Sequence, residues 1–264
     1  MIVEAHVLRK VHVISCGHET GDKGSLTLLK DVGKIVEIPY HVYLIEDSEY
    51  KILVDTGTSV RWRELHPEEL VKSWPVYMKE EEYLDNRLAS LGFDLEEVDY
   101  VVNTHLHYDH CGNNEMFPKA TFLVNKNELA HALAPGWWEA PSYVRAVFDN
   151  PKLRYETIDG EFELTSGVRV VPSPGHSEGH QSVMVELART GLLVLAGDAV
   201  YLRENLETPI LPGLYVDARL YADSMRRLKH TVDLRKGTML LSHSKEYLSP
   251  QGWKSISENV YTFE

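Results

Sequence analysis

Cysteine, long apolar runs and an excess of basic residues are all lacking in this chain of 264 residues. Its two cysteines, Cys16 and Cys111, are too few for a disulfide framework. No segment approaches the ~18 uninterrupted apolar residues that a membrane span requires, and the N-terminus shows no basic leader followed by an apolar run. These absences predict a cytoplasmic protein that has no membrane partner.

The charge balance argues against nucleic acid as a partner. Asp and Glu number 40 against 27 Lys and Arg, which gives a formal net charge of -13. Nucleic-acid binding relies on Lys and Arg side chains that neutralise phosphates, and the chain contains no basic run. It also contains no low-complexity stretch and no linker, so we expect residues 1–264 to form a single domain.

Apolar, β-branched runs alternate with helical patterns along the chain. The predicted strands are Lys10–Ser15, His41–Glu46, Lys51–Asp55, Tyr100–Thr104, Thr121–Val124, Val168–Val171, Ser182–Glu186, Leu192–Ala196 and Thr238–Leu241. The predicted helices are Lys79–Leu91, Lys126–Ala134 and Asp217–His230. Strands outnumber helices and arrive in pairs, which indicates an α/β (α+β) fold of sheets covered by helices.

Histidine or aspartate follows several of these predicted strands. The segments 101–105, 172–176, 195–198 and 240–243 each end in one of these residues. Polar side chains at strand ends can converge on one rim while the apolar strands stay buried. Four such loops that meet at one point would build a metal site.

The strongest motif is His105-Leu106-His107-Tyr108-Asp109-His110. In an extended segment His105 and His107 point to the same side, so that both can bind one metal. His176 is the best candidate for a further ligand of that metal. Without a cation, packing so many polar side chains after a buried strand would carry a substantial cost.

A second metal position follows from the rest of the motif. Asp109 and His110 can reach it as the chain turns, and His243 completes it. Asp198 can bridge the two metals because a carboxylate offers two oxygens. Nitrogen and carboxylate ligands without a thiolate favour two Zn²⁺ ions per chain, and they also permit manganese, iron or cobalt. His180 either supports a ligand from behind or is structural, and we favour the structural role.

Two metals that share a carboxylate usually also share a water molecule, whose pKa falls from ~15.7 towards ~7. The resulting hydroxide can attack an electrophilic carbonyl or phosphorus. The motif therefore predicts a metal-dependent hydrolase.

Together these residues resemble the metallo-β-lactamase superfamily, whose signature is His-x-His-x-Asp-His followed by isolated His, Asp and His. The resemblance runs from about Tyr40 to about His243. It implies an αββα sandwich, in which two β-sheets are flanked by helices and the metals lie at the rim between the sheets.

Within that superfamily the chain resembles the N-acyl homoserine lactone lactonases most closely. The resemblance is carried by residues 52–57, 104–110, 174–182 and 198–201. It implies that Tyr201 contacts the carbonyl of a small-molecule lactone, and that Asp109 is both a ligand and the proton donor to the leaving alkoxide. The implied activity is quorum quenching, in which a metal-bridging hydroxide opens the lactone ring.

Two departures from the lactonase pattern keep alternatives open. Ser244 follows the last histidine where these lactonases commonly have aspartate, and Cys111 stands where they often have alanine. In having cysteine at this position, the chain resembles the related pyridoxolactonases. The alternatives are therefore another lactonase, or a thioester hydrolase similar to glyoxalase II. A metal-binding scaffold without activity is the non-enzyme alternative.

The roles of two segments stay open at this stage. Residues 135–148 are rich in aromatic side chains and could wall an acyl-chain pocket. Equally, Trp137 and Trp138 could pack under the domain or form the contact of a homodimer. Residues 17–25 read as a flexible loop that could cover the same site.

Overall fold

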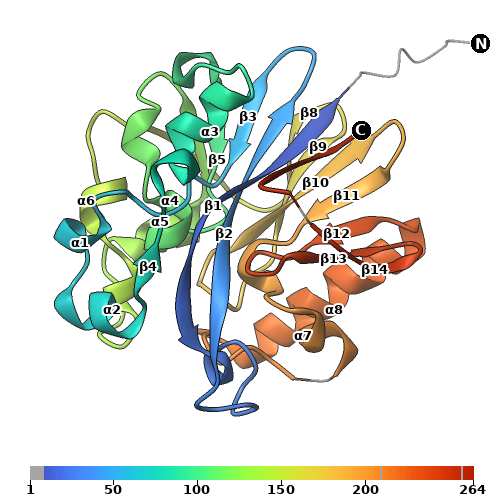
Figure 1. Ribbon diagram of the computed structural model, residues 1–264. Coiled ribbons are helices and arrows are strands. Elements are labelled where there is room, and N and C mark those ends of the chain that lie inside the picture. Colours follow the sequence, from blue (N-terminus) through green and yellow to red (C-terminus); the bar gives the residue numbers. More distant parts are fainter. Residues whose placement is uncertain (1–8, 209, 257) are drawn as a thin grey trace, which may run out of the picture.

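The alternation of buried side chains between the two faces of the central strands determines how the sheets and helices are layered. In the computed structural model, which describes residues 9–208, 210–256 and 258–264, Tyr43 and Ile45 belong to one buried cluster and Val42 and Leu44 to another. Because successive strand residues point to opposite faces, both faces of this strand are covered. Two sheets lie face to face, with helices outside each of them (Figure 1). The predicted αββα sandwich is confirmed.

The first sheet has eight strands and is mixed. Its order is β15 (Val260–Phe263), β1 (Lys10–Asp22), β2 (Ile35–Glu46), β3 (Lys51–Val54), β5 (Tyr100–Val102), β6 (Thr121–Asn125) and β7 (Arg154–Ile158), and β4 (Val76–Tyr77) also pairs with β1. Strands β3, β5, β6 and β7 are parallel to one another. Their carboxyl ends therefore meet at one edge, where His105 follows β5.

The second sheet has seven strands. Its order is β14 (Gly252–Ser255), β13 (Glu246–Ser249), β12 (Thr238–Leu240), β11 (Gly191–Leu195), β10 (Gln181–Leu187), β9 (Val168–Pro172) and β8 (Phe162–Thr165). Only β11 and β12 are parallel within it. The loops after these two strands carry Asp198 and His243, so the two residues start from neighbouring positions.

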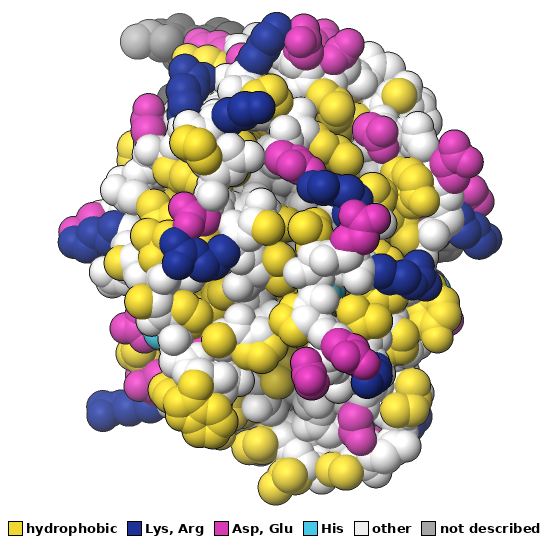
Figure 2. Space-filling model, turned by 90° about the vertical axis from the view of Figure 1, so that its left-hand side faces the viewer, with side chains coloured by type: hydrophobic (Ala, Val, Ile, Leu, Met, Phe, Trp, Pro, Cys, Tyr) yellow, Lys and Arg dark blue, Asp and Glu magenta, His cyan; other side chains and the backbone are white. Residues whose placement is uncertain are grey.

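Helices cover the outer face of each sheet. Those on the first sheet are α1 (Trp62–Leu65), α2 (Glu68–Ser73), α3 (Leu84–Ser90), α4 (Tyr108–Cys111), α5 (Lys126–Ala132) and α6 (Arg145–Phe148). Those on the second sheet are α7 (Arg203–Glu207) and α8 (Ala218–Arg235). Short 3-10 turns occur at η1 (Lys23–Ser25), η2 (Glu80–Glu82), η3 (Leu95–Glu97), η4 (Asn114–Met116), η5 (Ala140–Ser142) and η6 (Gly197–Ala199). Acidic and basic side chains are interspersed over the face shown in Figure 2.

Helix α8 packs an apolar face against the second sheet. Tyr221, Met225, Leu228 and Val232 recur at helical spacing and are buried against the sheet. The Asp217 carboxylate caps the first turn by accepting hydrogen bonds from two backbone N–H groups. Among the helices of the described residues, none is both long and apolar enough to cross a membrane.

The predicted helices differ from the observed ones in extent. The helix predicted over 79–91 is wrong as a single element, because Tyr83 is extended and separates η2 from α3. The helix predicted over 217–230 continues to Arg235 and ends where Lys236 adopts a left-handed conformation. The helix predicted over 126–134 ends at Ala132.

Each predicted strand overlaps an observed one, but six strands were missed. These are β4, β7, β8, β13, β14 and β15. Several of them, such as β7, have exposed positions on one or both faces, so their sequences lack a clear apolar alternation. Pairing with a neighbouring strand, which the sequence does not display, is what makes them strands.

Residues 17–25 are not the flexible loop that we expected. Strand β1 continues through a register shift between Ser15 and His18, and then pairs with β2 as far as Asp22. At this irregularity Gly17 has a φ of 86°, a conformation that glycine adopts without strain. The segment does reach the candidate site, but it does so as an ordered strand.

A buried ion pair ties the start of the chain to both sheets. The Arg9 guanidinium donates to the Asp47 carboxylate at 2.7 Å and to the backbone oxygens of Glu186 and Ser166. The side chains of Arg9 and Asp47 are only 4% and 1% exposed. Neither charge has access to water that could replace its partner.

Removal of one partner should therefore be costly. We expect Asp47→Ala to lower the free energy of unfolding by about 3–5 kcal/mol, because it leaves a buried guanidinium unpaired. Urea denaturation of the metal-loaded protein measures this change. Glu49→Ala, at an exposed position two residues away, should change stability by no more than about 0.5 kcal/mol. Equal effects of the two substitutions would show that the ion pair does not hold this region.

Candidate metal centre

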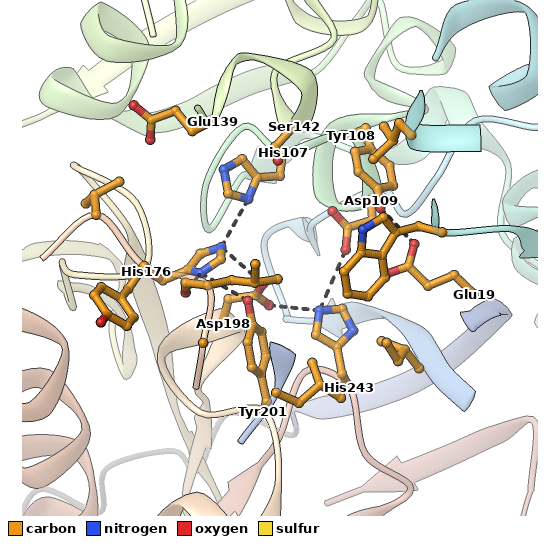
Figure 3. A pocket seen from close by; sticks show the side chains of 18 of the residues that line it. Glu19, His107, Tyr108, Asp109, Glu139, Ser142, His176, Asp198, Tyr201 and His243 are labelled. Carbon is orange, nitrogen blue, oxygen red and sulfur yellow. Dashed lines mark hydrogen bonds and ion pairs between the residues drawn. The ribbon is translucent and has the colours of Figure 1, made fainter. Parts of the chain in front are cut away.

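The loops at the shared edge of the two sheets bring the seven predicted ligands together. His105 follows β5, His176 follows β9, Asp198 lies in η6 after β11, and His243 follows β12. The other three predicted ligands are His107, Asp109 and His110. Figure 3 shows five of the seven side chains pointing toward one another: His107, Asp109, His176, Asp198 and His243.

Three imidazoles form the first group. His105 Nε2 lies 3.0 Å from His107 Nδ1, and His176 Nε2 lies 3.1 Å and 3.0 Å from these two atoms. Burial lowers the pKa of both His105 and His107 well below the usual value. Neutral imidazoles with converging lone pairs are the form that binds a metal ion, so this group could hold one.

Asp109, His110 and His243 form the second group. One carboxylate oxygen of Asp109 lies 3.4 Å from His110 Nε2 and 3.6 Å from His243 Nε2. One potential ligand atom from each residue lies within 4.8 Å of the others. Two nitrogens and one oxygen around a common point could also hold a metal ion.

Asp198 lies between the two groups. Its Oδ1 is 3.1 Å from His110 Nε2 and 3.2 Å from His243 Nε2, whereas its Oδ2 is 3.2 Å from His176 Nε2. Each carboxylate oxygen thus faces a different group, which is the arrangement of a bridging carboxylate.

Two buried atoms face each other at the centre, 3.1 Å apart. His110 Nε2 and Asp198 Oδ1 are buried, and neither forms a hydrogen bond with the described part of the chain. A buried polar atom without a partner costs free energy. A cation between the two groups would satisfy both atoms, so the donor set fits a pair of metal ions.

The far nitrogen of four of the five histidines lies close to a second residue. His110 Nδ1 lies 2.7 Å from Asp55 Oδ2, and His105 Nδ1 lies 3.0 Å from Thr104 Oγ1. Backbone oxygens take this role for two other histidines. His176 Nδ1 lies near the carbonyl oxygen of Leu214, and His243 Nδ1 lies near that of Pro39. Such partners fix the tautomer and turn the other nitrogen toward the metal position.

Asp55 is a residue of this site to which sequence reasoning assigned no role. It also accepts hydrogen bonds from the backbone N–H and hydroxyl of Thr104, at 2.7 Å and 2.8 Å. The carboxylates of Asp198, Asp109 and Asp55 outweigh the effect of burial and raise the pKa of His110 well above its usual value. Asp55 directly follows β3, so the placement that identified the ligands could have found it as well.

Glu128 was missed for a different reason. It lies in α5, is fully buried and accepts four hydrogen bonds. Its Oε1 accepts from the backbone N–H of Leu106 and from Tyr143, and its Oε2 accepts from Ser177 and from the backbone N–H of Gly179. The carboxylate thus joins the loop between His105 and His107 to the loop after His176. In the sequence Glu128 lies within a helical pattern, which predicted a helix but no role for this residue in the site.

His180 supports the turn that carries Asp198. Its Nε2 accepts a hydrogen bond from the backbone N–H of Asp198 at 2.9 Å. Gly197 has a φ of 56°, and a Cβ there would lie 2.7 Å from His180 Nε2. Only glycine therefore allows the close approach of ring and turn. The contact is to the backbone of a predicted ligand, which is the supporting role that we weighed against the structural role we favoured.

Tyr201 is buried beside the first group. Its hydroxyl lies 3.1 Å from His176 Nδ1. Burial, followed by the charge of Asp198, raises the pKa of Tyr201 well above its usual value. The phenol therefore keeps its proton at neutral pH and can donate a hydrogen bond.

A cavity of about 250 Å³ opens over these groups. Its polar floor includes His107, Asp109, Asp198, Tyr201 and His243 (Figure 3). Its walls combine apolar residues with the polar Glu19, Glu139 and Ser142; the apolar ones include Leu26, Ile38, Leu70, Trp74, Trp138, Leu214 and Tyr215. The arrangement offers reactive chemistry at the bottom and space for an apolar group above.

The aromatic segment 135–148 contributes to this wall. Trp138 lines the cavity although it is 63% exposed, and Trp137 is 85% exposed. The idea that these two tryptophans pack under the domain is therefore wrong. Tyr143, Val144, Val147 and Phe148 of the same segment are the buried residues. A homodimer contact through the tryptophans stays a prediction.

Comparisons with known proteins agree with this geometry. The family model of the metallo-beta-lactamase superfamily matches residues 36–243. An N-acyl homoserine lactonase of Bacillus thuringiensis is 31% identical over 251 residues, which cover 90% of this chain and 94% of the relative. A second such lactonase, from Azorhizobium caulinodans, is 30% identical over 86% of this chain and 88% of the relative.

A solved structure is similar over nearly the whole fold. It is an N-acyl homoserine lactone hydrolase with the product N-hexanoyl-L-homoserine bound at its catalytic metal centre. The TM-score is 0.80 at 30% identity, and the match covers 89% of this chain and 93% of the other.

Glu128 gives a test of how the first group is held. We expect Glu128→Ala to lower metal affinity by about 10–100-fold, because the loops that carry the three histidines lose their common acceptor. Competition with a chromogenic chelator measures this affinity. Glu156→Ala, at an exposed position on β7, is the matched control and should bind metal normally. A Glu128→Ala variant with unaltered affinity would contradict this positioning role.

Proposed function

Because this chain belongs to the metallo-β-lactamase superfamily, we propose that it is a metal-dependent lactonase that opens N-acyl homoserine lactones. The observation that carries the proposal is the placement of Asp198 between two ligand groups at the floor of a cavity that also presents Tyr201. The similarity to lactonases over most of the chain supports the substrate class.

We propose that the site holds two metal ions, with Zn²⁺ preferred. His105, His107 and His176 would hold one ion, Asp109, His110 and His243 the other, and Asp198 would bridge them. Zinc suits nitrogen and carboxylate donors without a thiolate, although manganese, iron and cobalt also accept them. When bound, such a pair supplies Lewis acidity and a hydroxide at neutral pH.

Tyr201 and Asp109 are the proposed catalytic residues of the chain itself. The Tyr201 hydroxyl would donate a hydrogen bond to the lactone carbonyl oxygen, which gains negative charge as the ring carbon is attacked. Burial disfavours ionisation of Asp109, but His110 outweighs it and lowers the pKa of Asp109. The ionised carboxylate could accept the proton of the attacking water and pass it to the leaving ring oxygen.

The walls of the cavity suit the remainder of the substrate. Leu26, Ile38, Leu70 and Trp138 offer an apolar surface to an acyl chain. This surface favours an acylated lactone over a small unsubstituted one.

We also propose that the chain forms one domain in the cytoplasm. Strands β13, β14 and β15 lie beyond the residues that the family model matches, yet they are hydrogen-bonded into the two sheets. A separate C-terminal unit would not share its strands in this way.

A substrate panel tests the lactonase proposal. Ring opening releases acid, so a pH-indicator assay of the metal-loaded protein should show turnover of N-acyl homoserine lactones that a chelator abolishes. The panel should include simple γ- and δ-lactones, a glutathione thioester and a β-lactam. Turnover of the thioester alone would reject the lactonase and favour a thioester hydrolase of the same fold.

Tyr201→Phe tests the proposed hydrogen bond to the carbonyl oxygen. Loss of one donor to a developing oxyanion costs ~10²–10³ in turnover, and a metal that shares the task should reduce the loss. We expect kcat on lactones to fall about ten- to a hundredfold, with the metal content and melting temperature retained. Tyr43→Phe, a matched change of a buried tyrosine outside the cavity, should retain normal kcat. A fall in the metal content of Tyr201→Phe would mean that the residue supports the metal site instead.

A further inference from the structure

A buried glutamate lies at the edge of the cavity and takes no part in the chemistry above. Glu19 belongs to β1 and is 4% exposed. It lines the cavity with Asp109 and His243, on the side opposite His176 (Figure 3). The surrounding wall is apolar, since Ile38, Leu70 and Trp74 line the same cavity.

Two tyrosines hold the Glu19 carboxyl group in one position. The hydroxyls of Tyr40 and Tyr108 both donate to Oε2, each at 2.7 Å. Both tyrosines are buried, so the carboxyl group cannot easily rotate away. Within the described residues no group donates to Oε1, and no Lys, Arg or His side chain forms an ion pair with Glu19. One oxygen therefore keeps its capacity to accept a hydrogen bond.

The fold alone does not account for a carboxyl group at this position. An apolar side chain could pack against the rings of Tyr40 and Tyr108 without the cost of burying a polar group. Burial, followed by the nearby Asp109 carboxylate, raises the pKa of Glu19 to about 8. Below that pH the free carboxyl group carries a proton, and an N–H donor bound at Oε1 would favour the ionised form that accepts its hydrogen bond.

We propose that Glu19 is a specificity-determining residue, whose Oε1 accepts a hydrogen bond from an N–H group on the lactone substrate. The N–H group belongs to an amide or an ammonium substituent close to the ring, because Glu19 lies beside Asp109 and His243 at the cavity floor. This inference rests on the proposed lactonase function and adds the substituent that the site selects.

Three lactones and three variants separate this role from a structural one. The lactones are an N-acyl homoserine lactone, homoserine lactone itself, and a γ-butyrolactone with an α-alkyl chain of matched length that lacks the N–H group. The variants are Glu19→Leu, Glu19→Gln and the control Glu37→Gln. Glu37 lies on β2, and its side chain is 63% exposed and outside this cavity.

We expect the wild type to prefer the lactones that carry N–H over the matched alkyl lactone. In Glu19→Leu the ratio of their kcat/KM values should fall about ten- to a hundredfold, the range expected when a buried N–H group loses its acceptor. The loss should appear mainly in KM, because Glu19 contacts the substituent and not the reacting bond. Glu19→Gln keeps an acceptor oxygen, so its ratio of kcat/KM values should lie between those of the wild type and Glu19→Leu. The ratio in Glu37→Gln should match that of the wild type.

The acylated and free amino lactones distinguish the two donors. A loss confined to one of them identifies that donor and supports the proposal. If Glu19→Leu does not fold, Glu19→Gln carries the test, since it preserves the volume and can still accept from the tyrosines. An unchanged ratio in a Glu19 variant that still opens lactones would overturn the role of Glu19 alone. A wild type that opens no lactone would overturn the proposed function and this inference together.

Discussion

The burial of many polar side chains at one edge of the sandwich is the constraint on which the rest of the structure depends. Imidazoles and carboxylates from two sheets are packed together with little access to water, and His110 Nε2 and Asp198 Oδ1 are buried without a hydrogen bond in the described chain. Such an arrangement is stable only when an ion or another buried charge compensates it. The donor set that we assign to two metal ions meets this requirement.

Several supporting residues fix the polar side chains at this edge relative to the apolar core. Asp55 holds His110, Glu128 joins the two loops of the first histidine group, and His180 supports the turn of Asp198. Each support comes from a different element, so the positions of the proposed ligands depend on the packing of both sheets. The buried pair of Arg9 and Asp47 contributes at the other end of β1 and β2, where it joins the sheets through backbone oxygens.

The cavity combines this polar floor with walls in which apolar side chains alternate with a few polar ones, and Glu19 is the polar residue of the wall beside Asp109 and His243. A substrate with a reactive ring and an apolar chain fits the combination of floor and wall. A carboxyl oxygen at the boundary between them adds a requirement for a donor near the ring. Strand β1, rather than the histidine motif, supplies this residue.

The sequence by itself determined the fold class, the family and which side chains would meet. The His-x-His-x-Asp-His segment and the isolated His176, Asp198 and His243 all stand directly after strands, and strand ends at one edge of a sheet must lie close together. That relation is local, so it can be read from spacing. Their roles as metal ligands, and the catalytic roles of Asp109 and Tyr201, are still predictions.

The tertiary structure alone decided the features that depend on contacts between distant residues. Residues 17–22 continue strand β1 because β2 pairs with them, and weakly patterned segments such as β7 become strands in the same way. Glu128 meets Leu106 and Ser177, and Glu19 meets Tyr40 and Tyr108, across separations of about 20 to 90 residues. No periodicity or spacing encodes such meetings, because they arise only when the sheets and helices are packed together.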